Sequence, residues 1–207
     1  MLTGGFLDEL ASAAPTPGGG GASACVGALA AALASMVGNI TANSKRYAAV
    51  HEEMRAAVGR LDALRADLLH LAELDAAAFK PLSEAFKLPA DTPAQIAEKD
   101  LALQSALVGA CDVPLDMMRT CASILGECAY MVREGSRMAL SDAGAAAVFA
   151  KAAIQGAALN IYINAGWMTD QALAVGYTSK AHQIIRESGS LADDLYKHVA
   201  ATVSGGE

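Results

Sequence analysis

Aromatic residues are scarce in this sequence. They make up 5% of its 207 residues, although hydrophobic residues make up 54%. Alanine and other small side chains therefore supply most of the apolar content. Small side chains bury little area each, but they let helix backbones approach one another closely. We expect tightly packed helices and a subunit interface formed by helix faces.

Clustered basic residues are also missing. Lys and Arg number 15 against 22 Asp and Glu, which gives a formal net charge of −7. Recognition of nucleic acid requires a basic patch or stripe on the protein surface. The sequence therefore argues against a nucleic-acid partner.

The cysteines form no CxxC pair, and none lies near a histidine at metal-ligand spacing: Cys25, Cys111, Cys121 and Cys128. We expect no bound metal ion, and free core thiols of the kind that persist in a reducing cytoplasm. The N-terminus also lacks the basic start and leucine-rich core of a signal peptide. These features predict a cytoplasmic protein.

No charged residue lies between Glu9 and Lys45. An uncharged stretch of this length could cross a membrane. However, it contains Pro15, Pro17 and four consecutive glycines and is otherwise mostly Ala, Gly and Ser, whereas insertion requires Leu, Ile, Phe or Val at the centre of the span. We expect a buried helix at residues 20–42 and no membrane partner.

Strand-like alternation is absent, and the hydrophobic periodicity is helical almost throughout. The clearest stripe recurs every three or four residues through Tyr47, Val50, Met54, Val58, Leu61, Leu64, Leu68, Leu71, Asp75, Phe79, Leu82 and Phe86. Pro81 should kink or end this helix, and Pro114 should break or bend the next one, because proline removes a backbone donor. The order Thr92, Pro93, Gln95 predicts a helix start with a capping box.

Two further helices are expected near the C-terminus. Ser141 and Asp142 read as the cap and first turn of a helix that ends near residue 167, and a last helix should cover residues 179–203. The pattern as a whole predicts an all-α fold. We expect an up-and-down bundle of long helices in a single domain over residues 1–207, dimerising through helix faces.

The first candidate site is the glycine run formed by Gly18, Gly19, Gly20 and Gly21, which follows Pro15-Thr16-Pro17. Glycines let a backbone approach a ligand closely, and the helix N-terminus behind them favours anions. The Lys-Ser/Thr partner of a Walker motif is missing. A tight turn with close helix contact would explain the same residues.

Asp75 is the second candidate, because it occupies an apolar stripe. A carboxylate there must be desolvated or paired, and either condition shifts its pKa. It is a candidate acid, base or charge partner, and the alternative is an Asp paired with a basic residue at an interface. Lys45, Arg46 and Tyr47, just past the uncharged helix, could bind a carboxylate tail or orient water. A solvated helix junction would also explain these three residues.

Two polar pairs complete the candidates. Simple capping accounts for Ser141 and Asp142. Asn160 and Asn164 lie one helical turn apart among Leu159, Ile161 and Ile163, and buried amides need partners. Either a ligand or a neighbouring helix could supply those partners.

Several segments together resemble the formiminotransferase-cyclodeaminase and methenyltetrahydrofolate cyclohydrolase family. They are Phe6 to Ser12, Pro15 to Ala22, Met36-Val37, Asn39-Ile40-Thr41, Lys45-Arg46-Tyr47, Asp75 with Ala78-Phe79, Lys87-Leu88-Pro89, Val113-Pro114-Leu115, Ser141-Asp142-Ala143-Gly144 and Ala158 to Asn164. The fourth glycine of the run resembles the pattern of stand-alone cyclohydrolases of methylotrophic bacteria, in which glycine often replaces the serine found at this position elsewhere in the family. Asn43-Ser44 and Gly135-Ser136 depart from the Gly-Lys and Gly-Asn often found in the family.

The resemblance implies a homodimer with a folate site near the subunit interface. It also implies hydrolysis of 5,10-methenyltetrahydrofolate to 10-formyltetrahydrofolate, with no cofactor beyond the folate substrate. The alternatives are cyclisation of formiminotetrahydrofolate with loss of ammonia and, in another class, a non-catalytic folate-binding scaffold. The length leaves no room for a transferase domain, which favours the cyclohydrolase.

If methenyltetrahydrofolate is the substrate, each candidate site residue can be assigned a catalytic or binding role. We assign Asp75 as the base that activates water, with Asp142 as second candidate, and Lys45 as the group that orients water or stabilises the forming oxygen. The glycine amides should contact the folate. Polar contacts to the substrate are expected from Tyr47, Ser141, Asn160 and Asn164.

Overall fold

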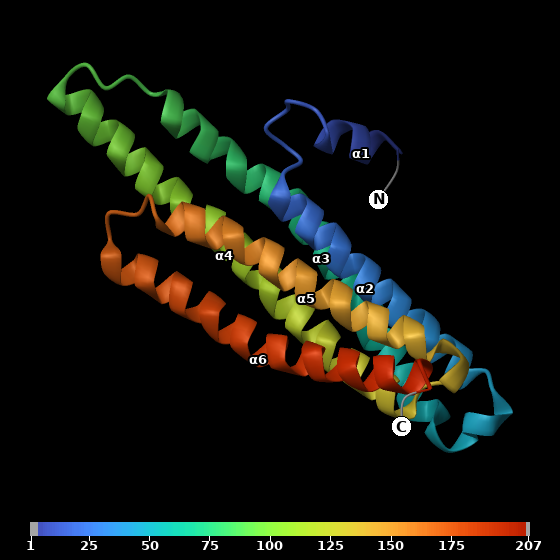
Figure 1. Cartoon of the computed structure of the whole chain (residues 1–207). Coiled ribbons are helices and arrows are strands. Elements are labelled where there is room, and N and C mark those ends of the chain that lie inside the picture. Colours follow the sequence, from blue (N-terminus) through green and yellow to red (C-terminus); the bar gives the residue numbers. More distant parts are fainter. Residues whose placement is uncertain (1–3, 206–207) are drawn as a thin grey trace.

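A computed structural model describes residues 4–205, which form six α-helices and two short 3₁₀ helices (Figure 1). The elements are α1 (Gly4–Leu10), α2 (Gly19–Ala42), η1 (Lys45–Val50), α3 (His51–Lys87), α4 (Pro93–Glu134), η2 (Arg137–Ala139), α5 (Leu140–Ala165) and α6 (Gln171–Val203). The described residues contain no strand, so the predicted all-α fold is confirmed.

Helices α2 to α5 run alternately up and down and close into a four-helix bundle, in which each contacts two main neighbours (Figure 1). Helix α6 packs on the outside of this bundle, against α5 and α4. Helix α1 contributes no buried residue. The up-and-down order follows from the short connections, because a short link between long helices makes them antiparallel neighbours.

Small residues bring the central helices close together. The buried face of α2 consists largely of Gly, Ala and Ser, and that of α5 largely of Ala. A Cβ added at Gly27 would lie 2.6 Å from Cys121 Sγ and 2.9 Å from Leu68 Cδ1. The close packing expected from the alanine-rich composition is therefore present, and larger side chains such as Met54, Leu125 and Ile161 fill the remaining core.

Proline does not end the long helices. Helix α3 continues through Pro81 to Lys87, and α4 continues through Pro114 to Glu134, so a helix break at either residue was wrong. Packing along the whole length of each helix outweighs the loss of one backbone bond. The capping box is confirmed, because Thr92 Oγ1 accepts from the N–H of Gln95 at 3.3 Å and Gln95 Oε1 accepts from that of Thr92 at 3.0 Å.

The C-terminal helices begin earlier than expected. Helix α6 starts at Gln171 rather than near 179, because Asp170 caps it by accepting from the N–H of Leu173 at 3.0 Å. Helix α5 starts at Leu140, so Ser141 lies inside the first turn, and no side chain caps this end. Ser141 as a helix cap was therefore wrong: the preceding η2 turn already directs the chain into the helix.

Among residues 4–205, three helical segments are long and apolar enough to cross a membrane by length and composition alone: Gly19–Ala42, Pro93–Glu134 and Arg137–Ala165. In the fold these segments pack against one another. Two thirds of the most apolar window of α2, 67%, is buried inside the bundle.

Candidate active site

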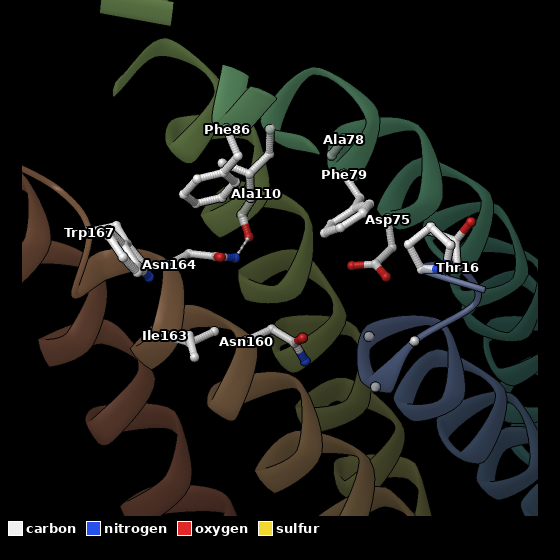
Figure 2. Close-up of a pocket in the computed structure, with 15 residues that line it drawn as sticks. Thr16, Asp75, Ala78, Phe79, Phe86, Ala110, Asn160, Ile163, Asn164 and Trp167 are labelled. Atoms are coloured by element: carbon white, nitrogen blue, oxygen red, sulfur yellow. Dashed lines mark hydrogen bonds between the residues drawn. The ribbon is translucent and has the colours of Figure 1, made fainter. Parts of the chain in front are cut away.

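A cavity of about 300 Å³ lies where the glycine loop meets α3, α4 and α5 (Figure 2). Its polar side chains are Thr16, Asp75, Asn160 and Asn164. Its remaining lining consists of Pro15, Gly18, Gly19, Gly20, Ala78, Phe79, Leu82, Phe86, Ala110, Ile163 and Trp167. Three of the predicted features, which are far apart in the sequence, therefore meet at one end of the bundle.

The glycine run forms the N-terminus of α2. Gly18 is the N-cap residue and supplies no side chain to the free N–H groups of the first turn. These groups and the helix dipole create a positive partial charge beside the cavity. Glycine leaves them accessible, because no Cβ covers them.

Asp75 reaches across from α3 to this helix end. Its carboxylate occupies the space that a Cβ of Gly20 would fill, so the two elements fit only with glycine at that position. Burial raises the pKa of Asp75, and hydrogen bonding with the backbone N–H of Gly21 partly opposes that rise. None of the ion pairs among residues 4–205 includes Asp75. The carboxylate is therefore partly desolvated, as expected, and its local partner is a helix end.

The two asparagines lie on the opposite wall, on the last turns of α5. Asn160 Nδ2 donates to the carbonyl oxygen of Gly156 at 3.2 Å, and Asn164 Nδ2 donates to that of Ala110 on α4 at 2.7 Å (Figure 2). Helix carbonyls thus satisfy one amide donor of each residue. No hydrogen bond within the described chain engages either Oδ1 atom, so both side chains keep an acceptor for a ligand.

Aromatic side chains close the end of the cavity away from Asp75. The rings of Phe86 and Trp167 meet edge to face, with centroids 5.6 Å apart. Trp167 follows α5 and is held by Gln104 of α4, whose Nε2 donates to the Trp167 carbonyl oxygen at 3.1 Å and whose Oε1 accepts from the N–H of Thr169 at 2.8 Å. Trp167 remains 56% exposed. Such rings provide flat apolar surfaces for a conjugated ligand.

The aromatic residues of the cavity were missed by the sequence reasoning. The signal was present for Phe79, Leu82 and Phe86, because they share the helical stripe of Asp75 and must face the same way. Nothing in the sequence distinguished Trp167 or Ala110, since their position depends on how α4 packs against α5.

Four predicted residues lie at the other end of the bundle. Lys45 and Tyr47 follow the C-terminus of α2, whose 24 residues span about 36 Å at roughly 1.5 Å per residue. Ser141 and Asp142 lie in the first turn of α5, whereas Asn160 and Asn164 lie near its end. Within one chain, these four side chains do not line the cavity that holds Asp75.

Their surroundings differ. Lys45 is exposed and Asp142 is half-buried. Tyr47 Oη accepts from the N–H of Arg137 at 3.0 Å, and this bond is the main reason that the pKa of Tyr47 is lowered. Ser141 borders an apolar groove between α5 and α6 with Phe149, Val199 and Val203.

The cysteines are all free and buried. Burial raises the pKa of Cys121 and of Cys128 to about 12, which leaves these thiols protonated and unreactive. Residues 4–205 contain no group of three or more His, Cys, Asp or Glu side chains that could hold a metal ion.

Comparisons with known proteins give the family and related proteins of this fold. The family described as formiminotransferase-cyclodeaminase matches residues 3–183. A methenyltetrahydrofolate cyclohydrolase of Methylorubrum extorquens is 37% identical over 199 residues, which cover 96% of each chain. A mouse formimidoyltransferase-cyclodeaminase is 36% identical over 80% of this chain but only 31% of its own length. The crystal structure of a formiminotetrahydrofolate cyclodeaminase from Thermotoga maritima superimposes with a TM-score of 0.79 at 30% identity, covering 97% of this chain and 94% of the other.

Proposed function

Because the chain belongs to the formiminotransferase-cyclodeaminase family, we propose that it is a methenyltetrahydrofolate cyclohydrolase acting in one-carbon metabolism. It hydrolyses 5,10-methenyltetrahydrofolate to 10-formyltetrahydrofolate. The full-length match to a cyclohydrolase supports this reaction over that of the longer bifunctional proteins, of which the chain spans about a third.

The observation that carries the proposal is the Asp75 carboxylate inside a cavity that contains no cationic side chain. The substrate carries a delocalised positive charge at its methenyl carbon. An anionic side chain in the lining therefore suits this substrate. A carboxylate with a raised pKa is also a stronger base than an ordinary aspartate.

In the first step, water attacks the methenyl carbon. A carbon–oxygen bond forms, the positive charge on the amidine nitrogens is neutralised, and Asp75 accepts one proton from the water. Gly18, Gly19 and Gly20 line the cavity at the start of α2, and the free N–H groups of this helix end can stabilise partial negative charge on the oxygen as its O–H bond breaks.

In the second step, the adduct collapses to the formyl group. The bond from this carbon to N5 breaks, and N5 gains a proton. The hydroxyl proton leaves as the C=O bond forms, and the resulting formyl carbon stays bound to N10. One of the two water protons ends on N5 and the other is released. Asp75 can return its proton to N5, so one residue serves as base and then as acid.

No cofactor beyond the folate enters this scheme. The Asn160 and Asn164 amides offer acceptors to the ring donors of the pterin, and Phe79, Phe86 and Trp167 provide apolar surface for the ring. The pterin ring is thus expected to bind to the cavity wall opposite Asp75.

Decay of the methenyl absorbance with purified protein tests the function. We expect decay well above the uncatalysed rate, because the substrate also hydrolyses by itself. Formiminotetrahydrofolate is assayed in parallel, since the Thermotoga maritima structure is of a cyclodeaminase. Faster turnover of the formimino substrate would identify the alternative activity. Binding without acceleration of either reaction would identify a non-catalytic scaffold.

We further propose that the chain forms a homodimer through α2 and α5. The outward stripe of α2 is apolar and incompletely buried over most of the helix, with the exposed Asn39 near its end: Ala22, Val26, Leu29, Leu33, Met36 and Ile40. On the neighbouring α5, Val148 and Leu159 are exposed. In Figure 1 the two helices lie side by side in front of α3 and α4. An apolar face of this extent is typical of a subunit interface.

In such a dimer, a twofold axis perpendicular to these helices would make the α2 helices of the two subunits antiparallel to each other. The C-terminus of one α2 then lies beside the N-terminus of the other. This arrangement brings the partner's Lys45, Tyr47, Ser141 and Asp142 towards the cavity that holds Asp75. We therefore retain Lys45 and Asp142 as catalytic candidates, and Tyr47 and Ser141 as substrate contacts, contributed by the second subunit.

The cytoplasm is the compartment that we propose for this enzyme. Four free, buried cysteines suit a reducing environment. Oxidising compartments favour disulfides in proteins that expose thiols during folding.

A further inference from the structure

Pro114 lies in the interior of α4, where it cannot donate a backbone hydrogen bond. The carbonyl oxygen four residues earlier belongs to Ala110, which lines the cavity. That oxygen therefore lacks its usual helical partner. The side chain of Asn164 takes this place, with its Nδ2 atom 2.7 Å from the Ala110 oxygen (Figure 2).

This bond fixes which way the Asn164 amide faces. A carbonyl oxygen can only accept, so the NH₂ end of the amide must turn towards Ala110. The other end, Oδ1, is then an acceptor, and no donor of residues 4–205 engages it. Asn164 borders the cavity at the end formed by Phe86 and Trp167, away from Asp75 (Figure 2). A helix defect in one element thus orients a side chain of another.

We propose that Pro114 is a positioning residue that makes Asn164 present a hydrogen-bond acceptor to the donor edge of the pterin ring, formed by its 2-amino group and N3–H. The inference rests on the proposed folate substrate. The donor edge lies across the ring system from N5, and Asn164 lies across the cavity from Asp75. The fixed acceptor therefore selects rings with donors at that edge and sets the reacting carbon near the base.

Alanine at position 114 tests the idea, because Pro114→Ala restores the N–H that pairs with Ala110 and releases the Asn164 amide. We expect KM for methenyltetrahydrofolate to rise about three- to ten-fold, the loss typical of one hydrogen bond, with kcat changed less than about two-fold. Asn164→Ala should give a similar rise. The double variant should be no worse than Asn164→Ala, because Pro114 acts through that residue.

Pro81→Ala is the matched control. Pro81 is also inside a long helix, but the carbonyl that it frees belongs to Ala77, which is exposed and does not line the cavity. This variant should leave KM unchanged. A Pro114→Ala enzyme with the KM of Pro81→Ala, or additive effects of Pro114→Ala and Asn164→Ala, would overturn the proposal.

A ligand series separates this inference from the proposed reaction. Fluorescence of Trp167, which is the one tryptophan of the chain, reports binding of tetrahydrofolate and of its 2-desamino analogue without turnover. The wild type should prefer the amino form, and Pro114→Ala and Asn164→Ala should lose most of that preference. Equal preference in all three proteins would contradict the role of Pro114. Failure of the wild type to bind or hydrolyse any folate would instead contradict the proposed function.

Discussion

At the level of single residues, Asp75 is held between two opposing influences. Burial raises its pKa, while the N–H groups at the start of α2 favour the charged form. The result is a carboxylate whose pKa lies above the ordinary aspartate value, which makes it a stronger base. Its carboxylate is held beside Gly20, and no ion pair within the described chain engages it.

Replacement of Asp75 by asparagine keeps the shape and removes the base. We expect Asp75→Asn to lose about 10²–10⁴-fold in kcat, the usual contribution of a general base. In the wild type, kcat/KM should fall on the acid side with an apparent pKa above the ordinary aspartate range, because burial raises that pKa. A pH–rate profile measures both effects, and an unshifted acid limb would remove Asp75 as the base.

The same substitution has a defined effect on stability. A carboxyl group whose pKa is raised in the folded state stabilises the fold below its unfolded-state pKa and loses that contribution as the pH rises through the folded-state pKa. Wild-type stability should therefore decline over that window, relative to Asp75→Asn. At neutral pH the variant should be as stable as the wild type or more so. Thermal unfolding of both proteins across pH checks the sign.

Glycine at position 20 is required by contact rather than by backbone conformation. In Gly20→Ala the new Cβ would overlap the Asp75 carboxylate, and a displaced catalytic group can cost on the order of 10² in kcat. Gly21→Ala is the control, because its Cβ would lie 3.6 Å from Pro17 Cβ, an ordinary contact. Steady-state kinetics of the pair should show a large loss in the first variant only. Equal losses of kcat in the two variants would mean that the run requires glycine for backbone flexibility and not for contact with the Asp75 carboxylate.

At the level of elements, α2 combines three properties in one uncharged helix. Small residues on its inner face allow close packing, its glycine end meets Asp75, and its outer stripe is apolar. A helix that is apolar on all sides is typically buried. The bundle covers one side of α2, and we attribute the other side to the second subunit.

Leu29, in the middle of that outer stripe and 45% exposed, tests the interface. Leu29→Glu would place a charge in an apolar contact, so we expect a monomer where the wild type is a dimer. Leu101→Glu on α4, at a side chain that is 74% exposed and off the α2–α5 face, should leave the mass unchanged. Sedimentation or light scattering measures the mass. A dimeric Leu29→Glu protein would place the interface elsewhere.

At the level of the whole molecule, the candidate residues divide between two ends of one bundle. Asp75 and the asparagines lie at one end, and Lys45 and Asp142 lie at the other. An antiparallel dimer joins opposite ends and creates two complete sites. One chain alone would then be inactive even when correctly folded.

Mixing two inactive variants tests this arrangement. Asp75→Asn and Lys45→Ala should each be nearly inactive alone. If the sites are shared, half of the randomly mixed dimers contain one intact site, so activity should recover to about a quarter of the wild-type value. Denaturing and refolding the variants together, then assaying the mixture, gives the measurement. A mixture as inactive as its components would mean that both residues serve the same chain's site, or that Lys45 acts only on folding.

The sequence by itself determined the helical class, the up-and-down order and the family. Helical periodicity, short connections and the Thr92 capping box are local properties, so they can be read without coordinates. The same stripe placed Asp75 on an apolar face. A helix end at Pro81 or Pro114 was wrong, because contacts with other helices outweigh the local preference there. The cap at Ser141 was wrong because the helix already begins at Leu140.

Only the tertiary structure decided which candidates share a site. Residues 18–20, 75 and 160–164 are distant in the chain, and their meeting depends on how α2, α3 and α5 are aligned along the bundle. The alignment also separates Lys45 and Asp142 from them by about the length of a helix. The Asn164 bond to Ala110 likewise joins two elements. The sequence specifies the chemistry of each side chain directly, whereas the distances between helices depend on how their faces pack.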